Sequence, residues 1–375
     1  MRYILTIILI LITSISNLSN SKNYNSTVKK NKIVSKKVSN ENRKGSIEEK
    51  IDALLKRTNF NGTALVSIKG KVVYKSSNGY ANFQKKEPLK LNSSFQLASV
   101  SKQFTAMSVM ILMERKKIHF DDPVKKYLPD FPYPNITIKH LLNHTSGLQN
   151  YMWLLDYYWK NPKNPTNRDV LNLFKTRTLP LNFQPGKRFC YSNTGYSFLA
   201  LIVEKVSGMP FADFVKKNIF IPLDMRNSFI YNRAKVDKNE KRVSGYYGSG
   251  RRARLVDDDK IDCILGDKGV YSTVEDLYKY DQALYNNKLV SKDTKEQSYN
   301  PGKLKNNQEI RYGYGWRLKE YKDKKVIYHN GQWHGFKTSF TRIVEDRNTI
   351  ILLNNTNSKL AGIIQGIEDI IYGYR

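Results

Sequence analysis

The pattern of apolar and polar positions predicts strands near both ends of the folded chain and helices between them. Ser46 and Glu49 have the spacing of a capping box, and apolar residues recur at helical spacing over the residues that follow. Residues 63–68 and 71–75 then look like two strands, joined at a tight turn that Gly70 permits. The pattern therefore predicts a helix followed by a β-hairpin.

The middle of the chain has mostly helical spacing. A helix is predicted from about Ser99 to Arg115, with Phe104, Met107 and Ile111 in its apolar stripe. Glycine and proline punctuate the pattern at positions 208 and 210. Further helices are predicted at 138–143, 168–175, 196–206, 210–220 and 273–285.

The chain ends with strand patterns at 325–328, 337–344 and 349–353, and with a helix from about Ser358. Strands at both ends around a helical block predict an α+β fold, in which both chain ends form one antiparallel sheet flanked by helices. We place this domain at residues 46–375. Residues 46–98 and about 300–375 would form its α/β part, and about 99–299 its large, mostly helical insertion.

The first 16 residues are typical of an export signal, with a positive Arg2 before an apolar run at 4–12. This run is shorter than the roughly 20 residues that span a bilayer. We therefore predict a signal peptide, with an uncleaved membrane anchor as the alternative, and a location in the periplasm or cell envelope of a bacterium. Residues 17–45 are rich in Lys, Ser and Asn and poor in large apolar residues, which predicts a disordered tether.

The formal net charge of +30 changes the choice of partners. Such a charge could attract anionic cell-wall polymers or membrane surfaces. The alternative is that lysine is scattered over every solvated face without binding a particular partner, and we favour this interpretation. Nucleic-acid binding is disfavoured, because no recognition helix, zinc spacing or RNA-binding motif organises the charge. We expect a monomer. Cys190 and Cys263 allow at most one disulfide, and their spacing leaves open whether they pair.

Ser99 and Lys102 form the first candidate catalytic motif, Ser-x-x-Lys. A serine hydroxyl needs a nearby base to act as a nucleophile, and residues three apart on a helix share a face. The helix N-terminus would also direct backbone N–H groups towards charge developing at Ser99. Burial and positive neighbours would lower the pKa of Lys102 and so allow it to accept a proton.

Two further motifs lie far along the sequence. In Tyr191-Ser192-Asn193, the tyrosine could relay a proton to the leaving group and Asn193 could bind a substrate amide. In His329-Asn330-Gly331, predicted to end a strand, the backbone N–H of Gln332 could join that of Ser99 as an oxyanion donor. His329 would face the substrate with positive or hydrogen-bonding character, and Gly331 would let the substrate approach the backbone.

The order and spacing of these motifs resemble the serine β-lactamase and penicillin-binding-protein superfamily, in particular its class C β-lactamase-like branch with D,D-peptidases and esterases. The resemblance covers residue 46 to the C-terminus. It implies acylation of Ser99 by an amide or ester, with Lys102 and Tyr191 as proton carriers and Asn193, His329, Asn330 and Gly331 contacting the substrate. It also rests on residues 95–98, 141–148, 266–273, 312–316 and 331–336.

The third motif departs from the Lys-Thr-Gly of class C β-lactamases, and this weakens the case for efficient β-lactam hydrolysis. The substrate therefore stays open among D-amino-acid peptides, β-lactams and small esters. A catalytically silent envelope binding protein is the alternative function. A Ser–His–Asp hydrolase is disfavoured because the chain lacks a G-x-S-x-G elbow, and His144 is expected to be structural. No metal or other cofactor is expected, because the sequence contains neither H-E-x-x-H nor a Cys/His cluster.

Overall fold

The computed structural model describes residues 45–177, 179–231, 233 and 242–373. The predicted signal peptide at 1–16 and all but the last residue of the predicted tether at 17–45 lie outside the described residues. The described part of the chain forms one compact unit that begins at Gly45. No described helix is long and apolar enough to cross a membrane.

Both ends of this unit build one six-stranded antiparallel sheet, in the order β12-β13-β14-β15-β1-β2. The hairpin β1 (Gly62–Ile68) and β2 (Lys71–Asn78) joins the C-terminal strands where β1 pairs with β15 (Asn348–Asn354). The remaining strands are β12 (Arg317–Tyr321), β13 (Lys324–Trp333) and β14 (Phe336–Ile343). The predicted sheet shared by both chain ends is therefore confirmed.

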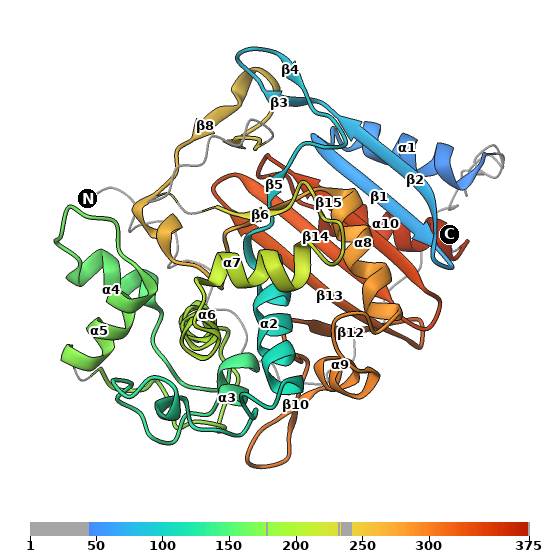
Figure 1. Cartoon of the computed structure of the whole chain (residues 1–375). Helices are drawn as coiled ribbons and strands as arrows, with labels where there is room; N and C mark the ends of the chain where they lie inside the picture. The colour runs from blue at the N-terminus through green and yellow to red at the C-terminus, as the bar shows by residue number, and fades with distance from the viewer. Residues whose placement is uncertain (1–44, 178, 232, 234–241, 374–375) are drawn as a thin grey trace, which may run out of the picture. The chain divides into compact units, whose positions relative to one another are not determined.

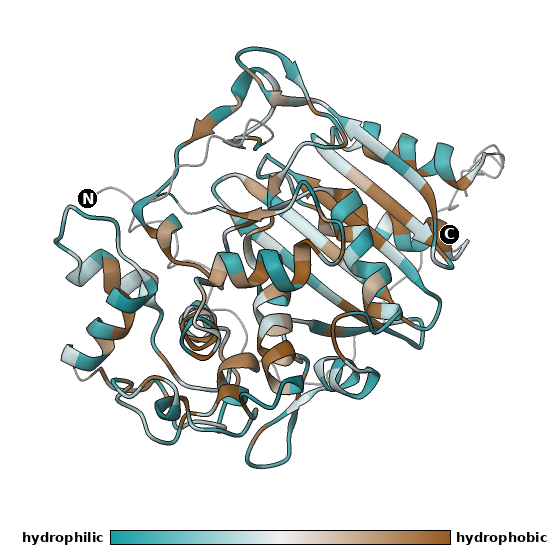
Figure 2. Cartoon of the chain, viewed as in Figure 1, coloured by the Kyte–Doolittle hydropathy of each residue, from teal (hydrophilic) through white to brown (hydrophobic). Residues whose placement is uncertain are grey.

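Both faces of this sheet are buried, which explains the unbroken apolar run in β15. Ile350 and Leu352 pack into a cluster with α1 (Ile47–Arg57) and α10 (Ala361–Ile371). Ile351 and Leu353 pack on the other side, in the larger core that includes α8 (Val274–Tyr285). Figure 1 shows α8 on one face and α1 and α10 on the opposite one, and Figure 2 shows the hydrophobic residues along the central strands.

The chain between β2 and β12 carries most of the helices. The long central ones are α2 (Lys102–Glu114), which a 3₁₀ turn at Ala98–Ser101 (η3) precedes, and α6 (Asn193–Ser207). The other helices are α3 (Ile138–Leu142), α4 (Tyr151–Tyr158), α5 (Asn167–Arg177), α7 (Phe211–Val215) and α9 (Lys292–Ser298). Short strands connect them: β3 (Tyr80–Asn82), β4 (Glu87–Pro88), β5 (Phe95–Gln96), β6 (Phe229–Ile230), β7 (Gly245–Tyr247), β8 (Arg254–Val256), β9 (Val270–Ser272), β10 (Gly302–Lys303) and β11 (Glu309–Ile310).

The pattern missed the short strands β3 to β11, which are two or three residues long, and also three longer elements, α4, β12 and α9. Aromatic residues occupy both the buried and the exposed face of α4, since Tyr151 is fully buried while Trp153 is 74% exposed, so no apolar stripe stands out. The polar sequences of β12 and α9 also lack a clear period.

The capping box at Ser46 and Glu49 was predicted correctly. Cys190 is an exposed thiol and Cys263 a buried one, and these two described cysteines do not form a disulfide.

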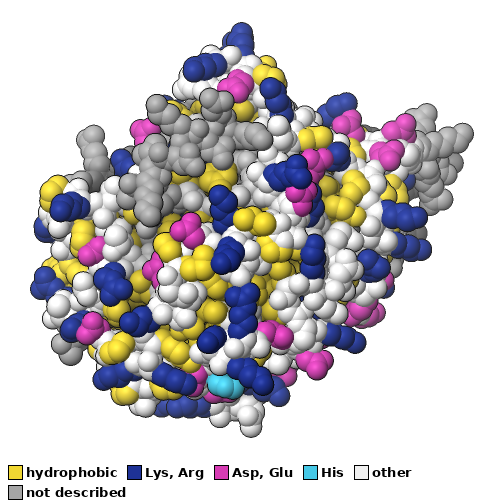
Figure 3. Space-filling view, viewed as in Figure 1, with side chains coloured by type: hydrophobic (Ala, Val, Ile, Leu, Met, Phe, Trp, Pro, Cys, Tyr) yellow, Lys and Arg dark blue, Asp and Glu magenta, His cyan; other side chains and the backbone are white. Residues whose placement is uncertain are grey.

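Basic side chains are spread over the face of the molecule drawn in Figure 3 rather than gathered into one patch. Apolar and uncharged atoms separate them across that face. This distribution agrees with the interpretation of the charge as scattered lysine.

The buried ion pair between Arg342 and Asp281 ties β14 to α8, with Nε of the arginine 2.5 Å from the carboxylate. We expect Arg342→Met to lower the free energy of unfolding by about 3–5 kcal/mol, because it leaves Asp281 as an uncompensated buried charge. Urea denaturation measures this loss. Lys75→Met, which breaks the exposed pair with Glu275, should cost no more than about 1 kcal/mol. Equal losses in the two variants would contradict the argument from burial.

Candidate active site

Ser99 is presented by a strained turn between β5 and α2. It is partly exposed, whereas every other residue from Ser93 to Leu112 is buried. The preceding Ala98 has φ of +49°, in the left-handed region that costs a non-glycine residue about 1 kcal/mol or more. The chain thus maintains a strained backbone next to the one accessible hydroxyl of this segment.

Neighbouring strands fix this turn from two sides. The Leu97 N–H donates to the Val270 carbonyl at 2.8 Å, and the Thr338 hydroxyl donates to the Leu97 carbonyl at 2.8 Å. Strand β13 packs so closely that a Cβ at Gly331 would lie 2.2 Å from the Leu97 oxygen. Glycine at 331 was expected to admit the substrate. The structure gives another reason for it, because the glycine lets β13 contact the turn that carries Ser99.

Lys102, the first residue of α2, is completely buried beside Ser99. Its Nζ lies 3.1 Å from Ser99 Oγ, 2.8 Å from Asn193 Oδ1 and 2.9 Å from the Asp267 carbonyl oxygen. Burial lowers the pKa of Lys102 to about 7, against an upward effect of Asp267 and with a further downward effect of Arg317. The structure therefore brings three of the residues predicted from sequence and resemblance, Ser99, Lys102 and Asn193, into direct contact.

The partners of Lys102 suit a neutral amine. Asn193 Oδ1 and the Asp267 carbonyl can only accept hydrogen bonds, so they take the two N–H groups of a neutral amine. Its lone pair then remains for the third partner, the Ser99 hydroxyl, which can donate. With this arrangement the amine can remove the proton of Ser99.

The Tyr191 hydroxyl is buried and points at the same site, but makes no formed hydrogen bond among the described residues. Burial raises the pKa of Tyr191, and the nearby Ser99 opposes this effect. Tyr191 is therefore a protonated phenol near neutral pH. The hydroxyl lies beside Ser99, where it could donate a hydrogen bond to a bound molecule.

Two buried histidines support the site as neutral rings. His144 Nδ1 accepts from the Ser192 backbone N–H at 3.1 Å and thereby holds the Tyr191 loop. His329 Nδ1 lies 2.8 Å from the Asn330 carbonyl, so Nδ1 carries the proton and Nε2 accepts from the Tyr312 hydroxyl at 3.0 Å. Burial lowers the pKa of both histidines well below the usual value. His329 was expected to face the substrate with positive or hydrogen-bonding character. Its ring is instead buried and neutral, and both of its nitrogens already have protein partners.

The His329-Asn330-Gly331 motif lies within β13 instead of ending a strand, because β13 continues to Trp333. The hairpin to β14 closes with positive φ at both His334 and Gly335, a two-residue turn. Since hydrogen bonding alternates along antiparallel strands, the Gln332 N–H faces away from β14. Strand β12 pairs with β13 only up to Tyr328, so it does not cover this edge. The exposed Asn330 and Gln332 thus lie on an open strand edge next to the Ser99 turn.

Sequence reasoning assigned no role to two charged residues beside Lys102. The Arg317 guanidinium lies 5.0 Å from the Tyr191 ring, and the Asp267 carboxylate is buried. Asp267 stands between glycines 266 and 269, which both have positive φ, and this bracketing is the signal that could have marked it. Among the described residues, no group of three or more His, Cys, Asp or Glu could hold a metal ion.

Comparison with known proteins places the domain in a family. The Beta-lactamase family profile matches residues 47–363. This chain belongs to the beta-lactamase family. The matched range includes the sheet strands of both chain ends and every residue of the candidate site.

Relatives within this family carry different names. The chain is 37% identical to penicillin-binding protein 4* of Bacillus subtilis over 347 residues, covering 89% of this chain and 77% of that protein. It is 24% identical over 295 residues to a D-aminopeptidase of Brucella anthropi, covering 78% of this chain and only 56% of that protein. The crystal structure of a penicillin-binding protein from Bacillus halodurans superposes with a TM-score of 0.74 at 27% identity, covering 85% of this chain and 98% of that one.

The state of Lys102 predicts how the reactivity of Ser99 depends on pH. Below pH 7 the amine is an ammonium and cannot accept a proton, so the rate of reaction with a fluorophosphonate should fall about tenfold per pH unit, with a midpoint near 7. Lys102→Arg, which stays charged, should be unreactive throughout the range. A midpoint near 4, as a carboxylate base would give, would contradict the assignment.

Proposed function

We propose that this protein is an exported serine hydrolase that forms a covalent acyl-enzyme on Ser99 with an amide or ester substrate. The observation that carries the proposal is the buried Lys102 amine 3.1 Å from the Ser99 hydroxyl, with its other two partners restricted to accepting. Export is supported by the apolar segment at 4–12. The names of the relatives, which include D-aminopeptidase, support hydrolysis as the reaction class.

In the acylation step, Ser99 Oγ bonds to the substrate carbonyl carbon while its proton passes to Lys102. The negative charge that develops on the carbonyl oxygen is stabilised by the backbone N–H groups of Ser99 and Gln332. Within the described part of the chain, the Asn193 side-chain NH₂ donates only weakly, to Met152 Sδ at 3.8 Å, and it would donate to the substrate.

The leaving group then departs with a proton. The Tyr191 hydroxyl is placed to donate that proton and to recover one from Lys102, since it is protonated, buried and unpaired. Deacylation repeats the sequence with water as the nucleophile: Lys102 takes the proton of water, and Ser99 Oγ leaves the acyl carbon and regains a proton. Both half-reactions therefore use the same base.

The position of Arg317 favours a substrate that carries a negative charge close to the reacting carbonyl. Arg317 is partly exposed. Within the described part of the chain, its guanidinium lies over the rings of Tyr191 and Tyr312 and forms no ion pair with a carboxylate. An accessible guanidinium beside a catalytic site suits a carboxylate, which it can bind through two N–H groups. We therefore propose carboxylate-bearing amides or esters as the substrate class.

Removing the Ser99 hydroxyl tests the reaction class. We expect Ser99→Ala to abolish fluorophosphonate labelling and to lower p-nitrophenyl ester hydrolysis at least about a thousandfold. Ser108→Ala is the matched control in the following helix α2, because that hydroxyl is buried and bonds back to the Phe104 carbonyl. If no acylating probe labels the wild-type protein, the enzyme proposal fails, and a silent binding protein becomes the better account.

Arg317 is tested with a pair of esters that differ only in a carboxylate and its neutral methyl ester. Because Arg317 also lowers the pKa of Lys102, the two esters are compared well above pH 7, where the Lys102 amine is neutral with or without Arg317. There Arg317→Gln should lower kcat/KM for the anionic ester about ten- to a hundredfold, the loss of one charge-assisted contact, and leave the neutral ester nearly unchanged. Arg311→Gln, at an exposed position nearby, is the control. Equal losses for both esters would contradict the substrate class.

A further inference from the structure

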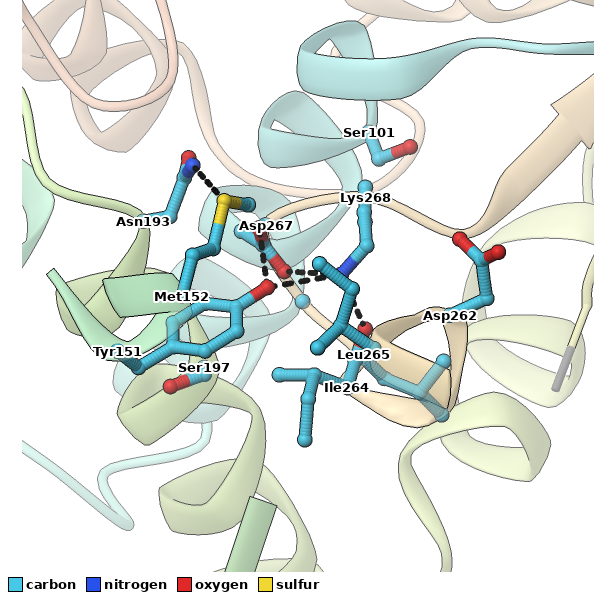
Figure 4. A network of polar contacts seen from close by, with 12 residues as sticks. Ser101, Tyr151, Met152, Asn193, Ser197, Asp262, Ile264, Leu265, Asp267 and Lys268 are labelled. Carbon is cyan, nitrogen blue, oxygen red and sulfur yellow. Dashed lines mark hydrogen bonds and ion pairs between the residues drawn. The ribbon is translucent and has the colours of Figure 1, made fainter. Parts of the chain in front are cut away.

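A buried ion pair that the catalytic steps do not use lies directly behind Lys102. Lys268 Nζ is 3.6 Å from Asp267 Oδ1, and both side chains are at most 4% exposed. The Tyr151 hydroxyl joins the two, donating to Asp267 Oδ2 at 3.0 Å and accepting from Lys268 Nζ at 2.8 Å (Figure 4). The Ile264 carbonyl accepts a further bond from Lys268 at 3.1 Å.

The same loop holds the catalytic base. The Asp267 backbone carbonyl accepts from Lys102, and the carbonyl of Gly266 accepts from Thr105 at 2.6 Å, one turn further along α2. On the other side, Tyr151 donates its backbone N–H to Thr194, the residue after Asn193, at 2.8 Å. Tyr151 therefore connects both acceptors that position the Lys102 amine.

We propose that Asp267 and Lys268, clamped by Tyr151, act as positioning residues that orient Lys102 and set the charge balance around its amine. This inference rests on the proposed function, in which Lys102 is the base. The side chains of the pair do not bond to Ser99 or to Lys102 Nζ, and the pair acts on Ser99 only through Lys102, which the Asp267 backbone carbonyl contacts.

The charges that face Lys102 explain why the pair matters. Burial raises the pKa of Tyr191 and Tyr196 and lowers the pKa of His144 and His329, so these four groups are uncharged near neutral pH. The charged groups are then Asp267, Lys268 and Arg317. The groups that face Lys102 are Ser99 from η3, His144 after α3, Tyr191 before α6, Tyr196 in α6, Asp267 and Lys268 before β9, Arg317 in β12 and His329 in β13.

Asp267 and Lys268 act on Lys102 in opposite directions. The Asp267 anion raises the pKa of Lys102 against the dominant effect of burial. Burial is the main cause that lowers the pKa of Lys268, Asp267 raises it, and Lys102 lowers it further. Because the repulsion between two cations is mutual, a charged Lys268 disfavours the ammonium form of Lys102. Asp262 also faces Lys268 and raises its pKa. Loss of the Asp267 charge should therefore lower the pKa of Lys102, and loss of the Lys268 charge should raise it.

Single and double substitutions test this balance. Asp267→Asn should move the acidic midpoint of kcat/KM down by about one to two pH units, and Lys268→Gln should move it up by a similar amount. The double variant should return near the wild-type midpoint. Because the double variant contains no uncompensated buried charge, it should also be the most stable of the three, which keeps the test open if a single variant unfolds.

Glu368→Gln provides a matched control, because this carboxylate on the C-terminal helix α10 is also buried but pairs with Lys319 of β12. It should lower the melting temperature without moving the midpoint. Carbon-13 NMR of the Lys102 side chain, which needs no turnover, should give the same opposite shifts. The inference is overturned if the acidic midpoints of Asp267→Asn and Lys268→Gln move in the same direction, or if they move no further than the midpoint of Glu368→Gln. If the two variants show opposite NMR shifts but the wild-type protein does not acylate, only the proposed function is refuted and the positioning role stands.

Discussion

The contact between the buried Lys102 amine and the Ser99 hydroxyl is the interaction on which the rest of the site depends. A lysine completely removed from water is unstable as an isolated ammonium, so its surroundings must either neutralise it or supply partners. The structure does both, because burial lowers its pKa to about 7 while three oxygen atoms surround the nitrogen. Two of these acceptors come from distant parts of the sequence, and the site therefore forms only when the whole domain folds.

The sheet brings these distant parts of the chain together around the Ser99 turn. Strand β13 reaches the Ser99 turn only because residue 331 is glycine, and the Thr338 hydroxyl of β14 holds the Leu97 carbonyl from the same side. On the other side, the loop before β9 bonds to α2 at Lys102 and at Thr105. Strain at Ala98 is thus balanced by packing from both halves of the fold.

Much of this could be predicted from sequence, because the signals are local. The capping box at Ser46, the hairpin at Gly70 and the one-turn spacing of Ser99 and Lys102 each need only a few neighbouring residues. The sheet shared by both chain ends was inferred from the order of the elements, and the structure adds that β1 and β15 are the strands that join them.

The rest depends on contacts between distant residues. The neutral state of His329 follows from its burial against Tyr312, and the role of Gly331 follows from the Leu97 oxygen. The network of Tyr151, Asp267 and Lys268 joins a helix without a clear apolar stripe to a loop between two glycines. No spacing along the chain predicts such a meeting.

The most direct measurement is the titration of Lys102 itself in the wild-type chain, with ¹³C-labelled lysine and assignment by loss of the signal in Lys102→Arg. The account predicts that the resonance assigned to Lys102 titrates near pH 7, far from the bulk near 10.5. If Lys102 titrates with the bulk, the amine is an ammonium under working conditions, and it cannot be the base that activates Ser99.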